Sequence, residues 1–184
     1  MNGDFALTPH IPTDRAITRK VRKETGAHYT PQILADFVAE KIIQSGVASK
    51  KGEKIRILDP SVGDGELLFS VAQKLKSTGA KLEINGFDTD TAAVNTAKRR
   101  LENSFSTLNV AIRREDFTLF SLNYKNEGSL FPLPKYDVVI ANPPYVRTQV
   151  LGAIQSQELA RSFGLTGRVD LYHVFIAGIA AVLL

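Results

Sequence analysis

The chain has 184 residues, and its 23 Lys and Arg against 19 Asp and Glu give a formal net charge of +4. With 43% hydrophobic and 23% charged residues it has the length and composition of one folded domain, which excludes an intrinsically disordered chain. No cysteine is present and the longest apolar run, 174–184, is too short to span a bilayer, so we exclude disulfide frameworks, thiolate sites and a membrane partner, and expect a cytoplasmic protein.

The first 24 residues are expected to form an N-terminal arm (residues 1–24), and residues 25–184 the folded domain. The arm holds a basic stretch, 15–23, which is either a solvated helix face or a contact for phosphate groups. Between residues 31 and 46, apolar side chains recur at a spacing of three to four. This pattern predicts a helix with Thr30 as its N-cap and Pro31 at its first position.

Short apolar runs alternate with helical periodicity along the rest of the chain. Strands are predicted at residues 55–58, 82–87, 110–112 and 136–141. Helices are predicted at 66–76, 91–104 and 169–184, with a loop at 121–135 and an irregular stretch with a short helix at 146–168. The alternation predicts an α/β fold with a parallel sheet, and the continuous apolar strands predict that both of its faces are covered. Ligands bind such sheets beyond the carboxyl ends of the strands.

The segment after the first strand is Asp59-Pro60-Ser61-Val62-Gly63-Asp64-Gly65. Two glycines, two residues apart, allow a tight turn and a close approach of the backbone to a ligand. The third glycine of a dinucleotide fingerprint is missing, because Leu68 stands there, and no Gly-Lys-Ser/Thr follows as in a phosphate loop. A tight turn without a ligand remains the alternative.

Acidic residues follow the second and third strands. Asp88 is suited to accept hydrogen bonds from the two hydroxyls of a ribose, whereas Asp90 is placed to cap the next helix. Asp116 could accept from the amino group of an adenine while Phe117 packs on the ring, although a surface acid beside a core aromatic fits the same pattern.

The fourth strand is followed by Asn142-Pro143-Pro144-Tyr145. The prolines fix the backbone and remove N–H donors, which leaves a rigid array of hydrogen-bond acceptors. The Asn142 side chain and a neighbouring main-chain carbonyl can converge on one amino group, and Tyr145 can stack on the ring that carries the amine. This motif is therefore predicted to hold a planar amine.

Together, these motifs resemble those of the gamma-class DNA adenine methyltransferases of restriction–modification systems. The resemblance rests on Asn142 to Tyr145, on the glycine loop, on the upstream Thr-Gly-Ala-His-Tyr-Thr-Pro at 25–31, and on the Asp-Leu-Tyr at 170–172. It implies a Rossmann-like class I methyltransferase fold, with a mostly parallel sheet flanked by helices, that uses S-adenosylmethionine.

The resemblance also implies a role for each motif. Thr30 and Pro31 would lie near the methionine carboxylate, and Asp59, Gly63 and Gly65 would shape the methionine pocket. Asp88 would hold the ribose, and Asp116 and Phe117 the adenine of the cofactor. The residues Asn142, Pro143, Pro144 and Tyr145 would be catalytic, and no metal site is implied.

The implied activity is the methylation of the exocyclic amino nitrogen of an adenine that is flipped out of double-stranded DNA. Complete members of the family continue with a fifth to a seventh strand and a target-recognition domain. We therefore expect a partial catalytic domain, incomplete at its C-terminal side and inactive alone, that self-associates through an open edge beside the fourth strand.

Two other kinds of function remain open from the sequence. One is methylation of a glutamine in a protein or of a guanine in RNA, because Asn-Pro-Pro-Tyr also occurs there. The other is a non-catalytic module that binds a nucleotide or DNA. The segments 25–31 and 170–172 favour the DNA adenine methyltransferase.

Overall fold

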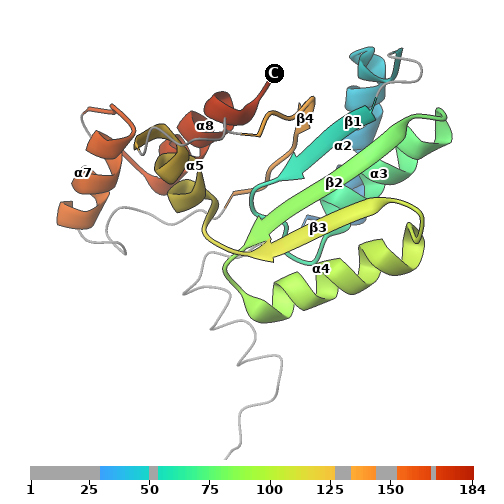
Figure 1. The fold of residues 1–184 in the computed structure, drawn as a ribbon, viewed down its shortest axis with the longest axis horizontal. Helices are drawn as coiled ribbons and strands as arrows, with labels where there is room; N and C mark the ends of the chain where they lie inside the picture. The colour runs from blue at the N-terminus through green and yellow to red at the C-terminus, as the bar shows by residue number, and fades with distance from the viewer. Residues whose placement is uncertain (1–29, 50–53, 127–133, 144–152, 167–168) are drawn as a thin grey trace, which may run out of the picture.

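The computed structural model describes residues 30–49, 54–126, 134–143, 153–166 and 169–184. Its centre is a sheet of four parallel strands in the order β3-β2-β1-β4 (Figure 1). The strands are β1 (Lys54–Asp59), β2 (Lys81–Asp88), β3 (Asn109–Arg114) and β4 (Val138–Val139). The predicted α/β fold with a parallel sheet is confirmed.

Helices pack on the sheet and beside it. They are α2 (Gln32–Gln44), α3 (Glu66–Ser77), α4 (Thr91–Ser104), α5 (Phe117–Asn126), α7 (Ala153–Ser162) and α8 (Leu171–Val182), with a 3₁₀ turn, η1 (Val47–Ser49). One core joins α2, α3 and α4 to one face of the sheet, for example at Ile57 and Ile84. A second core joins α5 and α8 to the other face, where Leu58 and Phe87 point. Helices therefore lie on both faces (Figure 1).

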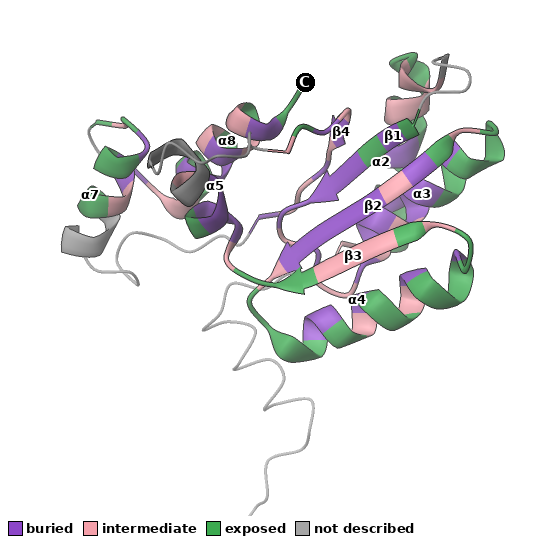
Figure 2. Cartoon of the chain, viewed as in Figure 1, coloured by how far each residue is buried: buried purple, intermediate pink, exposed green. Residues whose placement is uncertain are grey.

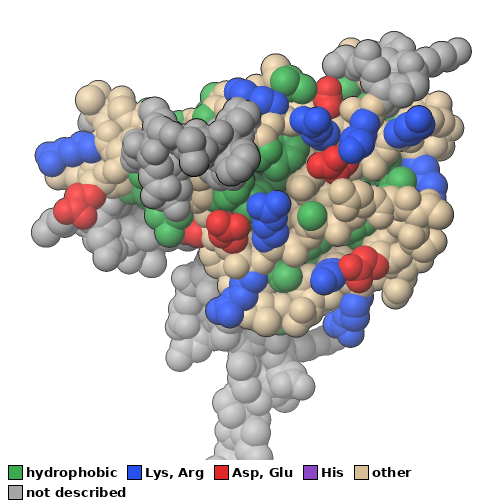
Figure 3. Space-filling view, viewed as in Figure 1, with side chains coloured by type: hydrophobic (Ala, Val, Ile, Leu, Met, Phe, Trp, Pro, Cys, Tyr) green, Lys and Arg blue, Asp and Glu red, His purple; other side chains and the backbone are tan. Residues whose placement is uncertain are grey.

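Among the residues that the structure describes, helices cover the second face only over the carboxyl half of the strands. Within the described residues, Lys54 and Arg56 at the start of β1 are exposed, while Leu58 and Asp59 at its end are buried (Figure 2). The prediction that both faces are covered is confirmed at the carboxyl ends of the strands, and among the described residues α5 and α8 pack only against this half. Charged side chains occupy the uncovered part (Figure 3), and Lys54 Nζ lies 2.9 Å from Glu83 Oε2 across two strands.

The loop predicted at 121–135 is wrong for its first six residues, which belong to α5. Asp116 starts this helix, because its Oδ1 accepts hydrogen bonds from the Thr118 N–H at 2.8 Å and the Thr118 hydroxyl at 2.6 Å. Phe117 and Phe120 then lie three residues apart on the face that packs into the second core. Burial of these aromatics outweighs the loop-forming composition of the following segment. Residues 127–133 lie outside the described residues.

The last predicted helix and the fourth strand are both shorter than expected. Helix α8 begins at Leu171, after a capping box in which the Asp170 N–H donates to Nδ1 of His173 at 3.2 Å, and it ends at Val182. The Tyr136 N–H then donates to the Val182 carbonyl at 2.9 Å, and the Leu184 N–H donates to the Tyr136 carbonyl at 3.0 Å. We expected an open edge beside the fourth strand, but at Tyr136 this edge is paired with residues 182–184.

Helix α2 begins one residue later than predicted. Its N-cap is Pro31, and no side-chain hydrogen bond caps it. The predicted cap by Thr30 is therefore wrong, and the Thr30 hydroxyl makes a different contact, described below.

A cofactor-type pocket at the ends of the strands

The loop after β1 is a tight turn that needs both of its glycines. Gly63 and Gly65 have φ angles of 54° and 83°, which side chains rarely tolerate. A Cβ on Gly65 would also lie only 3.0 Å from the Cα and Cβ of Ala97 on α4. The loop is thus closed against the neighbouring helix, as the glycine spacing predicted.

The carboxylate of Asp88, at the end of β2, holds this loop in place. Its Oδ2 accepts a hydrogen bond of 2.9 Å from the Gly63 N–H, and its Oδ1 accepts one of 2.9 Å from the Asp90 N–H. Asp90 in turn caps α4 by accepting from the Ala92 N–H at 2.7 Å, which confirms its predicted structural role. Each carboxylate oxygen has two lone pairs, so Asp88 keeps capacity for a ligand while it holds the loop.

A second clamp on the loop was not predicted from the sequence. Arg100 of α4 reaches Oε2 of Glu66 at 2.6 Å and Oδ2 of Asp64 at 3.7 Å. The guanidinium therefore ties the end of the loop and the first residue of α3 to α4. Nothing in the sequence marks this contact, because 34 residues separate Arg100 from Glu66.

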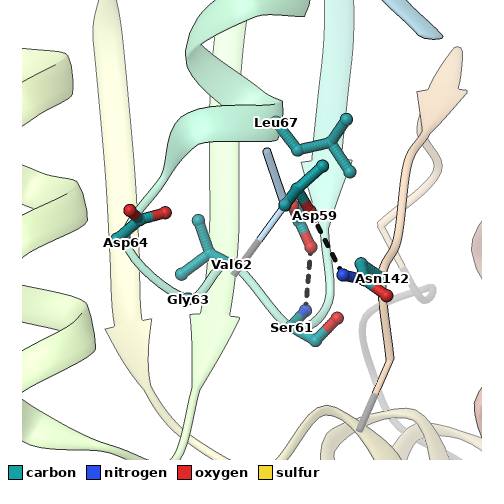
Figure 4. A pocket seen from close by; sticks show the side chains of 8 residues that line it. Asp59, Ser61, Val62, Gly63, Asp64, Leu67 and Asn142 are labelled. Carbon is teal, nitrogen blue, oxygen red and sulfur yellow. Dashed lines mark hydrogen bonds between the residues drawn. The ribbon is translucent and has the colours of Figure 1, made fainter. Parts of the chain in front are cut away.

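Beside the loop lies a pocket with an empty volume of about 240 Å³, including its open mouth. It is lined by Thr30, Asp59, Ser61, Val62, Gly63, Asp64, Leu67 and Asn142 (Figure 4). The pocket thus brings together three of the predicted motifs, which lie far apart in the sequence. The pocket is small and open to solvent, so its lining can hold one end of a larger cofactor rather than enclose the whole molecule.

Thr30 and Asn142 are in direct contact across this pocket. The Nδ2 group of Asn142 donates a hydrogen bond to the Thr30 hydroxyl at 3.2 Å, although the two residues are 112 positions apart. The segment before α2 is therefore joined to the segment after β4 at the place where the two motifs were expected to act.

Asp59 forms a buried acidic wall of the pocket, with 1% of its surface exposed. Burial raises the pKa of its carboxyl group to about 7; the hydrogen bond from the Ser61 N–H, at 2.9 Å, lowers the pKa, and the nearby Asp88 raises it. A cationic group of a ligand, bound next to this carboxyl group, would favour its ionised form.

The hydroxyl of Ser61 is buried and has no hydrogen-bond partner among the described residues. It lines the same pocket as Asp59 and the Thr30 hydroxyl. One acid and two hydroxyls match the ammonium and the carboxylate of an amino acid, which is the end that S-adenosylmethionine carries. The residues present therefore fit the cofactor that the sequence implied.

The other predicted site residues are spread around this pocket. Asp116 caps α5, and Phe117 is 1% exposed and packs 6.0 Å from Phe175 in the second core, so the structure does not bring Phe117 into the pocket. Pro31 is exposed and Pro143 is buried. Residues 144 and 145, and with them the predicted Pro144 and Tyr145, lie outside the described residues.

The part of the chain that the structure describes contains neither a cluster of metal ligands nor a membrane-spanning helix. No group of three or more His, Cys, Asp or Glu side chains there is placed to hold a metal ion. None of the helices described is both long enough and apolar enough to cross a membrane.

Comparison with known proteins gives a consistent set of matches. The family model described as Eco57I restriction-modification methylase matches residues 80–183, more than half of the chain. The chain is 45% identical over 165 residues to the Type II methyltransferase M.BanIII of Aneurinibacillus aneurinilyticus; the match covers 84% of this chain and 28% of that protein. The chain therefore spans under a third of the length of this relative.

A more distant relative is a tRNA1(Val) (adenine(37)-N6)-methyltransferase of Pseudoalteromonas atlantica, at 28% identity over 109 residues, with coverage of 59% of this chain and 38% of the relative. Among solved structures, a Listeria monocytogenes protein assigned to the class I S-adenosylmethionine-dependent methyltransferases matches with a TM-score of 0.63 and 18% identity. That match covers 92% of this chain and 49% of that one. The expected Rossmann-like class I methyltransferase fold is confirmed.

The raised pKa of Asp59 predicts how stability depends on pH. The folded pKa of about 7 lies above the ordinary value of 3.8, so the folded protein binds this proton more tightly than the unfolded chain. The stability that the neutral carboxyl contributes is fully present below pH 4 and is lost as the pH rises through about 7. The side chain of the variant Asp59→Asn is always neutral. The free energy of unfolding of this variant, relative to that of the wild type, should therefore be higher at pH 8 than at pH 5.

Urea unfolding of both proteins at the two pH values measures this gain. An equal stability difference at pH 5 and pH 8 would show that Asp59 titrates at its ordinary value and is not desolvated.

Proposed function

Because this chain belongs to the Eco57I restriction-modification methylase family, we propose that it transfers a methyl group from S-adenosylmethionine to the exocyclic amino nitrogen of an adenine in double-stranded DNA. Residues 25–184 then form the cofactor-binding catalytic part of a restriction–modification enzyme, and 1–24 an arm before it. The reaction takes place where the DNA is, in the cytoplasm.

One observation carries this proposal: the glycine loop, Thr30 and Asn142 line a single pocket. In this proposal the glycine loop binds the cofactor, and Asn142 binds the amine of the substrate. A methyl transfer requires both partners within bonding distance, and holding them there can contribute a large part of the rate acceleration.

Several residues are proposed to hold the cofactor. The Asp59 carboxylate binds its ammonium group, and the hydroxyls of Thr30 and Ser61 donate to its carboxylate. The glycine loop lets the backbone approach closely, and Asp88 accepts from the ribose hydroxyls. Near the adenine ring we propose Asp116, and the core residue Phe117 supports that side from behind.

The cofactor supplies a methyl group bound to a positively charged sulfur, which leaves as a neutral thioether. The target amine is a weak nucleophile, because its lone pair is delocalised into the purine ring. We propose that the Asn142 side-chain oxygen and the main-chain carbonyl of Pro143 accept hydrogen bonds from its two N–H groups, which localises the lone pair on nitrogen. These dipoles also stabilise the positive charge that develops there, so no carboxylate base is required before attack, and the extra proton on nitrogen leaves to water after the methyl group is transferred.

The substrate side of the proposal follows from the geometry of a duplex. An amino group inside a base stack is out of reach of a pocket, so the adenine must be flipped out. Stacking on Tyr145 would contribute about 1–3 kcal/mol to holding it, and we propose that Pro144 restricts the backbone before that ring. Self-association through the edge beside β4 remains part of the proposal, although Leu184 already bonds to Tyr136 there.

A second substrate is favoured by one comparison. The relative from Pseudoalteromonas atlantica is named for adenine in a tRNA, and it is 28% identical over 109 residues. RNA adenine is therefore the alternative, with the same amine chemistry and the same pocket.

The experiment is a methylation assay of the full-length protein with labelled S-adenosylmethionine on duplex DNA and on tRNA, followed by digestion to nucleosides. We expect N6-methyladenine in DNA. N4-methylcytosine would contradict the adenine assignment, and label only in tRNA would favour the alternative. For the 184-residue chain, assayed beside it, we propose cofactor binding without methylation of DNA.

Two substitutions separate the amine side of the pocket from the cofactor side. Asn142→Ala should lower kcat by at least a hundredfold, in the range seen when a transition-state dipole is removed, while the affinity for cofactor stays within about twofold. Asp88→Ala should weaken cofactor binding first, since it removes both the ribose contact and the Gly63 contact. Calorimetric titration and turnover measurements on both variants test this; a kcat for Asn142→Ala equal to that of the wild type would exclude the proposed role.

A further inference from the structure

The hydrogen bond between Thr30 and Asn142 joins the cofactor side of the pocket to the amine side. Asn142 Nδ2 donates to the Thr30 hydroxyl at 3.2 Å, and both residues line the pocket. An amide has a donor end and an acceptor end, so whichever end faces Thr30 decides which end faces a substrate. The proposed reaction needs the oxygen on the substrate side.

A threonine hydroxyl alone does not decide between the two ends. It carries one proton and two lone pairs, so it can accept from an amide N–H or donate to an amide oxygen. The choice becomes fixed when the proton of the hydroxyl is used elsewhere. A carboxylate is an acceptor only, and a hydroxyl that donates to it keeps only lone pairs for its other neighbour.

We propose that Thr30 is a positioning residue that couples cofactor binding to the orientation of the Asn142 amide. When the hydroxyl donates to the carboxylate of the cofactor, it can only accept from Asn142 Nδ2. The Asn142 oxygen is then held as the acceptor for the target amine. This inference rests on the proposed function and gives Thr30 a second role, besides its contact with the cofactor.

The structure around the contact supports a coupling of this kind. Thr30 immediately precedes Pro31, which starts α2, and that helix is anchored by the fully buried Ala35 and Ala39 and by the bond from the Ser70 hydroxyl to Asp36 at 2.8 Å. The hydroxyl is therefore attached to a fixed element. On the other side, the Ile140 N–H donates to the Leu58 carbonyl at 2.9 Å, which holds the chain just before Asn142 against β1.

The test compares Thr30→Val, which keeps the shape and removes the hydroxyl, with Thr30→Ser, which keeps the hydroxyl. Three quantities are measured on the full-length protein: the affinity for S-adenosylhomocysteine, the affinity for a duplex that the wild type methylates, with and without S-adenosylhomocysteine, and kcat. In the wild type, S-adenosylhomocysteine should tighten binding of the duplex. This binding measurement does not depend on turnover.

We expect Thr30→Val to lose most of this tightening and to lower kcat by about tenfold, in keeping with the loss of one hydrogen bond. Thr30→Ser should stay within about twofold of the wild type in both. The affinity of Thr30→Val for S-adenosylhomocysteine alone should fall as well, because the hydroxyl also contacts the cofactor.

Other results would overturn the inference. If Thr30→Val weakens only cofactor binding, with the tightening and kcat unchanged, then Thr30 is a cofactor contact and does not orient Asn142. If Thr30→Ser loses as much as Thr30→Val, then the methyl group and not the hydroxyl matters. A wild type that methylates neither DNA nor RNA adenine would instead refute the proposed function, and the inference with it.

Discussion

The hydrogen bond from the Gly63 N–H to the Asp88 carboxylate is the contact on which the site depends. It fastens the loop after β1 to the end of β2 at 2.9 Å, in a conformation that only glycines adopt readily. Arg100 holds the other end of the loop through Asp64 and Glu66. A backbone that is fixed at both ends can offer its N–H groups to a ligand at a small entropic cost, because the loop is already ordered before binding.

The strand order explains why the remaining groups meet at this loop. Strand β1 lies between β2 and β4, so the segments that follow these two strands flank the loop after β1. All strands are parallel, and their carboxyl ends therefore lie at the same edge of the sheet. Asp88 arrives from one side and Asn142 from the other, with Asp59 between them. Chemistry between a cofactor and an amine can then use groups that are 54 residues apart along the chain.

Much of this arrangement could be predicted from local sequence patterns. The strands, the glycine turn and the cap at Asp90 depend on residues within a few positions of one another, and the periodicity and the turn chemistry report such contacts directly. The start of α5 was missed because one acidic side chain, Asp116, and two buried aromatics outweighed a loop-forming composition. Arg100 and the Thr30–Asn142 contact were missed because they join segments 34 and 112 residues apart. No local pattern encodes such pairs, so only the fold reveals them.

The most direct test of the central claim is a crystal structure of the protein with S-adenosylhomocysteine. We expect the amino-acid end of the ligand to lie in the pocket beside Asp59 and Thr30, the ribose hydroxyls to bind Asp88, and the sulfur to face Asn142. A ligand bound elsewhere, for instance on the uncovered face of the sheet beside Lys54 and Arg56, would contradict the assignment of the pocket and the mechanism built on it.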